Sequence, residues 1–94
     1  MSTRQIIFRL HAVQRMFERK ISPGNVRQIL ESGELIEDYS DDMPAPGGLM
    51  LGKRGNHPIH VVMTENSKND EIIVITAYEP APGKWKPGFR DRKE

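Results

Sequence analysis

Two groups of polar side chains in this sequence have the types and spacing that acid–base chemistry on a phosphodiester requires. In the first group, His11, Arg15 and Arg19 follow at intervals of four residues, which places them along one side of a helix. An imidazole transfers protons near neutral pH, and guanidinium groups stabilise charge that develops on phosphate oxygens. A solvated basic helix face, with His11 near the helix start, is the alternative interpretation.

The second group lies on two predicted strands, 58–64 and 71–79. Alternation places His60 on one face of the first strand, and Thr76 and Tyr78 on one face of the second. The three side chains converge only in the correct register, because a slip of one residue sends a strand's side chains to the other face. The alternative is that His60 is a structural histidine and that Thr76 and Tyr78 are ordinary strand formers.

Two helices are predicted to precede the sheet. Two apolar i,i+4 pairs, Ala12–Met16 and Val13–Phe17, predict the first over 11–20. A stretch suited to a short strand or an extended lead-in precedes it at 5–10. Ser22 and Pro23 are typical of a helix start, so the second is predicted over 23–32. Gly33 is expected to end that helix as a left-handed cap.

After Gly33 the pattern becomes strand-like and predicts four antiparallel strands, joined by short connections, at 34–39, 48–53, 58–64 and 71–79. The expected fold is α+β: two N-terminal helices packed on one face of a four-stranded antiparallel sheet. The helices are expected to cover an apolar face that includes Val61, Ile73 and Ile75. One domain is expected over 1–80, followed by a basic, irregular tail over 81–94.

Composition narrows the classes of protein and of site. Ninety-four residues suit one domain, and the absence of cysteine excludes disulfides and thiolate chemistry. No apolar run approaches the ~18 residues of a membrane span, so a cytoplasmic protein is expected. His57 and His60 have opposite strand parity, and no nucleotide-binding glycine loop is present. We therefore expect neither a metal nor a cofactor.

Charge is unevenly distributed along the chain. Residues 1–33 carry a net charge of +4, residues 34–50 carry −5, and the tail from Pro80 carries +3. Basic ends around an acidic middle are compatible with a phosphate-rich partner such as RNA, although this feature taken alone favours ordinary solvated charge. The residues expected to hold RNA phosphates are Arg19, Lys20, Lys84, Lys86 and Arg90.

The combined motifs resemble the domain-of-unknown-function family 4258. They are HAxxRM at 11–16, HVV at 60–62 and TxYxP at 76–80, and the resemblance covers the chain from about Phe8 to Trp85. It implies a RelE-like or barnase-like ribonuclease fold, and a toxin paired with a small zinc-binding antitoxin. It also implies active-site roles for His11, Arg15, His60, Thr76 and Tyr78. RelE-like enzymes tend to carry lysine and arginine on the sheet, where this chain has His60 and Thr76.

The sequence thus favours a metal-independent endoribonuclease, the toxin of a bacterial type II toxin–antitoxin system. A histidine would take the proton of a ribose 2′-hydroxyl, Arg15 would stabilise the developing charge, and Tyr78 would stack a base or donate a proton. The alternative is a non-catalytic protein-interaction or regulatory module of the same fold. The position of His11 relative to the face of His60 and Tyr78 separates these hypotheses.

Overall fold

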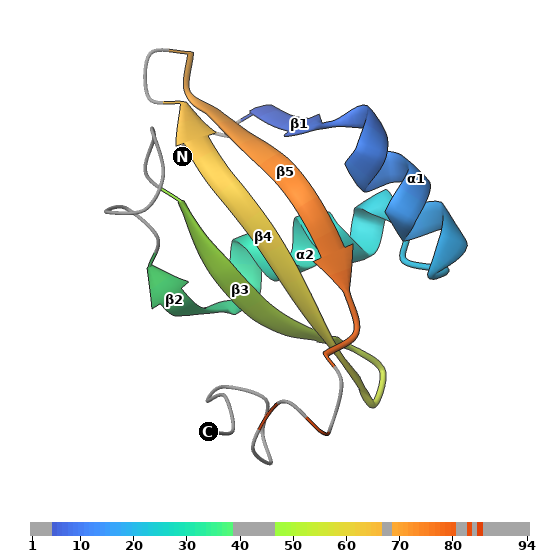
Figure 1. Ribbon diagram of the computed structural model, residues 1–94. Coiled ribbons are helices and arrows are strands. Elements are labelled where there is room, and N and C mark those ends of the chain that lie inside the picture. The colour runs from blue at the N-terminus through green and yellow to red at the C-terminus, as the bar shows by residue number, and fades with distance from the viewer. Residues whose placement is uncertain (1–4, 39–46, 67–68, 81–82, 84, 86–94) are drawn as a thin grey trace.

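The computed structural model describes residues 5–38, 47–66, 69–80, 83 and 85 of the chain (Figure 1). The elements follow in the order β1 (Gln5–Phe8), α1 (Leu10–Glu18), α2 (Pro23–Ser32), β2 (Glu34–Asp38), β3 (Gly47–Arg54), β4 (His57–Asn66) and β5 (Glu71–Tyr78). The fold is α+β, and both predicted helices are present with bounds shifted by no more than two residues.

The sheet has five strands in the order β1-β5-β4-β3-β2 and is mixed. β2 to β5 form the predicted antiparallel meander, but β1 adds a fifth strand that pairs in parallel with β5. The expectation of four antiparallel strands was therefore wrong at one edge. Parallel neighbouring strands need a long crossover connection, and the chain from α1 to β4 supplies it between β1 and β5. Local sequence patterns cannot reveal a pairing between segments so far apart.

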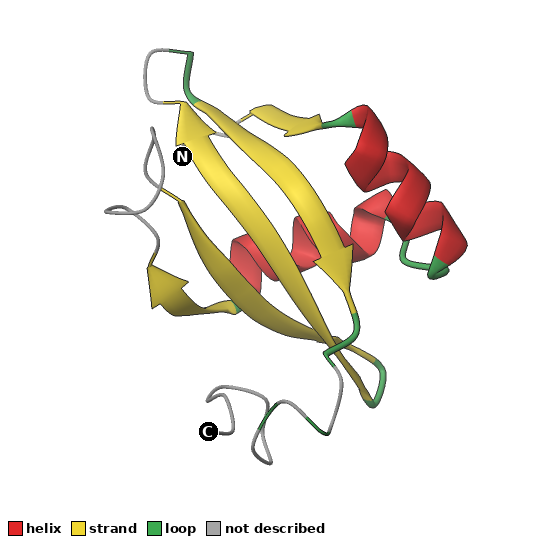
Figure 2. Ribbon diagram, viewed as in Figure 1, coloured by secondary structure: helices red, strands yellow, loops and turns green. Residues whose placement is uncertain are grey.

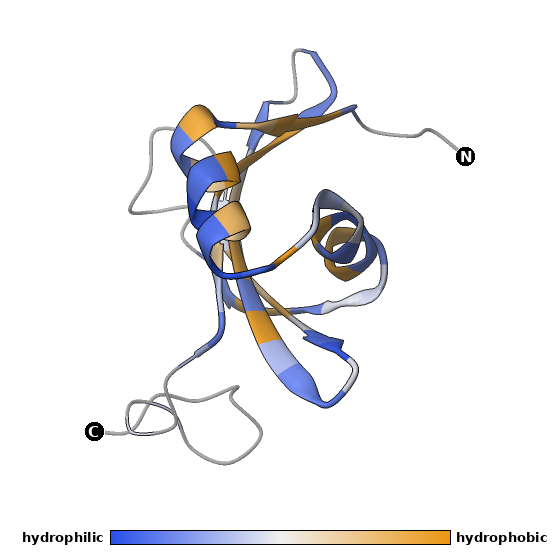
Figure 3. Cartoon of the chain, turned by 90° about the vertical axis from the view of Figure 1, so that its right-hand side faces the viewer, coloured by the Kyte–Doolittle hydropathy of each residue, from blue (hydrophilic) through white to orange (hydrophobic). Residues whose placement is uncertain are grey.

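The two helices contact different strands of the sheet. α1 packs against β5, and α2 packs against β3 and β4, as Figure 2 shows with α2 behind the sheet and α1 beside β5. Their buried residues form one core with the sheet, and Figure 3 shows the hydropathy of each residue along these elements. Its fully or almost fully buried members are Ala12, Met16, Ile21, Val26, Ile29, Met50, Ile59, Val61, Met63, Val74 and Ala77.

Local chemistry explains how α2 begins and ends. Ser22 is the N-cap: its hydroxyl accepts a hydrogen bond from the Asn25 backbone N–H, and the Asn25 side chain accepts one from the Ser22 backbone N–H. Gly33 does not adopt the predicted left-handed conformation, since its φ is −77°. Glycine is needed for space instead, because a Cβ there would lie 2.5 Å from the Ile29 carbonyl oxygen and 2.7 Å from that of Leu51.

A β-bulge changes which side chains of β5 reach the core. Val62 pairs with Thr76 but Met63 pairs with Val74, so Ile75 is an extra residue on β5. Val61 is fully buried, as predicted, but the fully buried residues of β5 in the core are Val74 and Ala77. Ile73 and Ile75 are only half-buried. The prediction that they lie under the helices was wrong, because it assumed strict alternation through the bulge.

Candidate functional site

Three exposed basic side chains lie along α1 and its C-cap. They are His11, Arg15 and Arg19, and we call them the basic row. The orientation of α1 positions them, because Ala12 and Met16 are buried against the sheet at 0% and 1% exposure. Residues three and four positions apart share a helix face, so the basic row occupies the flank of α1 next to its buried stripe. His11 is thereby an imidazole with access to solvent at the start of the helix.

The far end of the basic row is attached to β5. The Arg19 guanidinium donates a hydrogen bond of 2.9 Å to the Ala77 carbonyl oxygen. The pairing of β1 with β5 ends at Phe8 and Val74. The part of β5 after Val74 therefore has no β1 residue beside it, and α1 lies along that part instead. Ala77 stands between Thr76 and Tyr78, and the contact therefore brings the end of the basic row to the backbone of β5 between these two predicted site residues.

The near end of the row reaches the same strand. An open hollow is lined by Arg9, Leu10, His11 and the bulge residue Ile75. His11 therefore lies near the start of the part of β5 that β1 does not pair with, and Arg19 contacts the end of that part. The structure thus joins two sets of residues, on α1 and on β5, that the sequence presents as separate motifs.

The register of β4 and β5 brings the polar strand residues to one face of the sheet. His60 pairs with Tyr78, and Val62 pairs with Thr76. This face lies opposite the helices, because the alternate residues Ile59 and Val61 belong to the helix-covered core. Thr76 and Tyr78 are half-buried there and retain access to solvent.

His60 differs from the other predicted site residues because it has 0% exposure. Its ring makes edge-on contacts with Tyr78, at a centroid distance of 5.5 Å, and with Trp85, at 4.4 Å. Burial disfavours a charged imidazole, and a substrate cannot touch an enclosed ring. His60 is therefore a packing partner that orients Tyr78, and its enclosure does not fit the proton-transfer role inferred from the motif.

Trp85 is a site component that the sequence interpretation missed. It was assigned to an irregular tail, yet it is 4% exposed and covers His60. Its residue type was the available signal, since it is the only tryptophan of the chain. A large aromatic side chain loses much hydrophobic stabilisation when it is left in solvent, so it usually anchors the segment that carries it.

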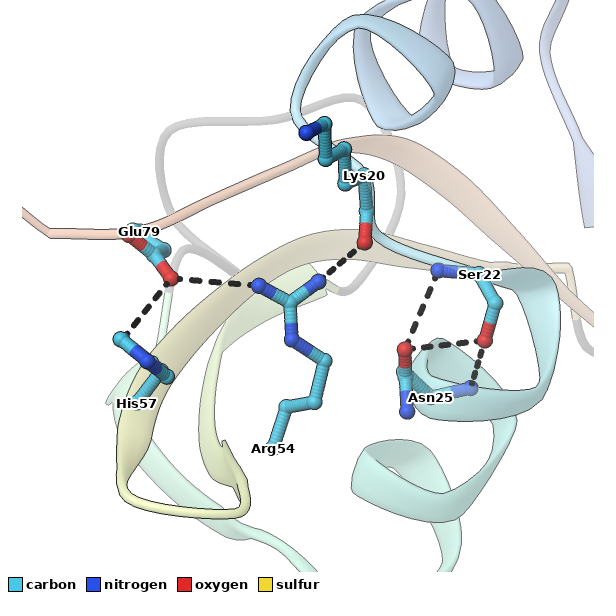
Figure 4. A network of polar contacts seen from close by, with 6 residues as sticks. All are labelled: Lys20, Ser22, Asn25, Arg54, His57 and Glu79. Carbon is cyan, nitrogen blue, oxygen red and sulfur yellow. Dashed lines mark hydrogen bonds and ion pairs between the residues drawn. The ribbon is translucent and has the colours of Figure 1, made fainter.

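A second missed feature is a polar network at the end of the β3–β4 hairpin (Figure 4). The Glu79 carboxylate lies 3.4 Å from Arg54 Nη2 and 3.4 Å from His57 Nδ1. The Arg54 guanidinium also donates a hydrogen bond to the Lys20 carbonyl oxygen. These exposed contacts contribute little free energy individually. Together they hold the hairpin, the turn after α1 and the end of β5 near one another.

The remaining predicted binding residues are placed as follows. Lys20 is exposed in the turn after α1. Lys84, Lys86 and Arg90 lie outside the described residues. Among the residues that the structure describes, no three His, Asp or Glu side chains gather in a way that would hold a metal ion. No helix in the described part is long and apolar enough to cross a membrane.

Comparison with known proteins identifies the family. The chain belongs to the domain-of-unknown-function family 4258, whose model matches residues 8–79. The matched segment contains α1 and β5, and hence both halves of the candidate site. Searches of curated proteins and of solved structures found no significant match.

Proposed function

We propose that this protein is a metal-independent endoribonuclease and that the α1–β5 edge is its active surface. The observation that carries the proposal is the hydrogen bond from Arg19 to the Ala77 carbonyl oxygen, which attaches the end of the basic row to β5 between Thr76 and Tyr78. The side chains of Thr76 and Tyr78 lie on the sheet face opposite the helices, so an RNA strand that crosses the edge at β5 would meet the basic row on one side and Tyr78 on the other. An accessible imidazole, guanidinium groups and a phenol on adjoining elements are the groups that phosphodiester cleavage uses.

In the proposed reaction, His11 takes the proton of a ribose 2′-hydroxyl, and the 2′-oxygen forms a bond to phosphorus. The bond from phosphorus to the 5′-oxygen breaks, and Tyr78 supplies the proton that this leaving oxygen needs. The products are a 2′,3′-cyclic phosphate and a 5′-hydroxyl. Arg15 stabilises the charge on the non-bridging oxygens, and Thr76 donates a hydrogen bond to one of them. His60 acts through Tyr78 as a positioning residue.

The biological role that we propose is that of the toxin in a cytoplasmic toxin–antitoxin pair. Its support is the sequence resemblance to RelE-like and barnase-like ribonucleases, together with membership of family 4258. The RNA phosphates would contact Arg19 and Lys20, with Lys84, Lys86 and Arg90 of the tail as further candidates. The proposed protein partner is a small zinc-binding antitoxin.

Cleavage of a fluorogenic single-stranded RNA by the purified chain tests the proposal. His11→Ala and Tyr78→Phe should each lower the rate by ~10²-fold or more, the usual contribution of an acid–base group. Arg15→Ala should lower it through lost charge stabilisation. The melting temperatures of His11→Ala and Arg15→Ala should match the parent, because both side chains are exposed. EDTA should leave the rate unchanged.

His60→Ala and His57→Ala separate chemistry from packing. His60→Ala should lower the melting temperature, because it opens a cavity between Tyr78 and Trp85. His57→Ala should change neither stability nor rate, since the His57 side chain is 67% exposed and lies at the hairpin end. A parent protein without activity, or His11→Ala with full activity, would contradict the proposal and favour the interaction module.

A further inference from the structure

A second surface of α1 is exposed and apolar. Leu10, Val13 and Phe17 are 70%, 42% and 86% exposed, and we call these three residues the apolar stripe. Their i, i+3 and i+7 spacing aligns them along the helix over about 10 Å. Val13 and Phe17 form an apolar pair that suggested a buried helix face, yet only Ala12 and Met16 of α1 face the core.

This stripe is separate from the proposed active surface. At 3.6 residues per turn, Leu10, Val13 and Phe17 lie on the side of α1 opposite the basic row. Aligned large side chains left in water mark interaction sites more often than single exposed apolar residues do. A molecule bound to the apolar stripe would leave His11 and Arg15 accessible.

Charges at both ends of the stripe indicate what it binds. Arg9 precedes Leu10, Lys20 follows Phe17 by three residues, and both are exposed. Within the described part of the chain, neither of these side chains has an ion-pair partner. The segment from Arg9 to Lys20 carries four cationic groups, and Glu18 is its only acidic residue. A complementary surface is therefore apolar at its centre and acidic at both ends.

Two other occupants fit these charges less well. A second copy placed α1 against α1 would bring like charges together, which opposes association. A second copy that offered its acidic strand β2, where Leu35 is 50% exposed, would make a head-to-tail contact, which generates open chains unless the rotation between copies closes a ring. An anionic membrane has the right charge, but a nine-residue helix with one side against β5 offers it little apolar surface.

We propose that the apolar stripe docks an acidic amphipathic helix of another protein. Such a helix would place apolar side chains at i, i+3 or i+4, and i+7 against Leu10, Val13 and Phe17, a recurring mode of helix recognition. Acidic side chains beyond its two ends would pair with Arg9 and Lys20. The proposal shares only Lys20 with the proposed RNA contacts and otherwise uses the opposite side of α1, so it can be tested separately from ribonuclease activity.

The test uses the full chain and a dye-labelled 16-residue helical peptide with leucines at that spacing and glutamates at both ends. A matched peptide has lysine in place of each glutamate. Fluorescence anisotropy should show saturable binding of the acidic peptide and none of the lysine peptide. Phe17→Ser should weaken binding at least about tenfold, the loss expected for one buried phenylalanine. Arg9→Glu should also weaken it.

Leu35→Ser is the matched control, since it removes an equally apolar exposed residue from β2 and should change the affinity less than twofold. The melting temperature of Phe17→Ser should equal that of the parent, and its RNA cleavage rate should be unchanged. Equal binding of the lysine peptide, or equal loss in Leu35→Ser, would overturn the proposal. Phe17-dependent self-association in sedimentation velocity would assign the stripe to a second copy. Phe17-dependent binding to phosphatidylglycerol vesicles without peptide binding would assign it to a membrane.

Discussion

At the scale of single residues, burial distinguishes the three histidines of the chain more sharply than the motifs around them do. His11 is exposed on α1, His57 is exposed beside Glu79, and His60 is enclosed by Tyr78 and Trp85. Only an imidazole that solvent and substrate reach can exchange protons during turnover. His11 therefore takes the catalytic role in the proposed mechanism, and His60 takes a structural one.

Lys20 shows a second residue-scale effect, in its backbone. Its φ of 59° is left-handed, a conformation that favours glycine. The position ends α1 in a Schellman motif: the Lys20 N–H donates to the Phe17 carbonyl oxygen, and the Ile21 N–H donates to that of Met16. A lysine at this position supplies a positive charge, but its Cβ makes the left-handed backbone strained.

Replacing Lys20 should therefore separate strain from charge. Lys20→Gly should raise the free energy of unfolding by about 1 kcal/mol, because glycine adopts a positive φ without steric conflict. Lys20→Ala removes the same charge but keeps the Cβ, so it should leave stability unchanged or slightly lower. Chemical denaturation of both variants measures the difference. Equal stability of the two would show that the left-handed backbone carries no strain.

At the scale of elements, the bulge at Ile75 determines the chemistry of both sheet faces. It lets Val74 point into the core while Thr76 and Tyr78 share the opposite face with His60. In a regular strand, Thr76 and Tyr78 would share the face of Val74, because they follow it by two and four positions. Without the extra residue in the strand, the core valine and the polar pair would compete for one side of the sheet.

Paired valine-to-threonine substitutions test this assignment. Val74→Thr should lower the free energy of unfolding by about 1–3 kcal/mol, because it puts a hydroxyl into the apolar core beneath the helices. Val62→Thr should have a much smaller effect, because Val62 is half-buried and lies on the polar face opposite Thr76. Urea denaturation gives both values. Equal destabilisation, or the reverse order, would place the bulge elsewhere.

At the scale of the whole molecule, the strand order separates the charges of the chain. The basic helix α1 packs on β5, next to the edge strand β1, whereas the acidic strand β2 forms the other edge. Glu34, Glu37 and Asp38 thus lie across the sheet from the basic row. The fold converts a charge pattern along the sequence into a sided molecule, which suits the orientation of a polyanion on one edge.

Salt dependence of RNA binding tests this sidedness apart from catalysis. A 2′-O-methyl RNA lacks the nucleophile and measures binding alone. Its association constant should fall with salt, and Arg15→Ala should reduce the slope of log K against log salt by about 0.7, the change for one lost phosphate contact to a single strand. Arg27→Ala removes an exposed arginine of α2, outside the basic row, and should leave the slope unchanged. Equal slopes for both variants would contradict a phosphate contact at Arg15.

Features that depend on near neighbours in the chain could be predicted from the sequence alone. The spacing of apolar residues predicted α1, α2 and the four strands of the meander, and Ser22 with Pro23 predicted the start of α2, because helix turns and caps involve residues only a few positions apart. The HAxxRM, HVV and TxYxP motifs also pointed to family 4258, which the family model confirmed. Both outcomes rest on local patterns.

How these helices and strands face one another depends on contacts between segments that are distant in the chain. The parallel pairing of β1 with β5, the bulge at Ile75, the enclosure of His60 by Trp85 and the contact of Arg19 with Ala77 each join distant or laterally paired segments. Packing and hydrogen bonding across the fold stabilise these four contacts, and neither leaves a periodic pattern in the sequence. Burial therefore distinguishes two histidines that look alike in the sequence.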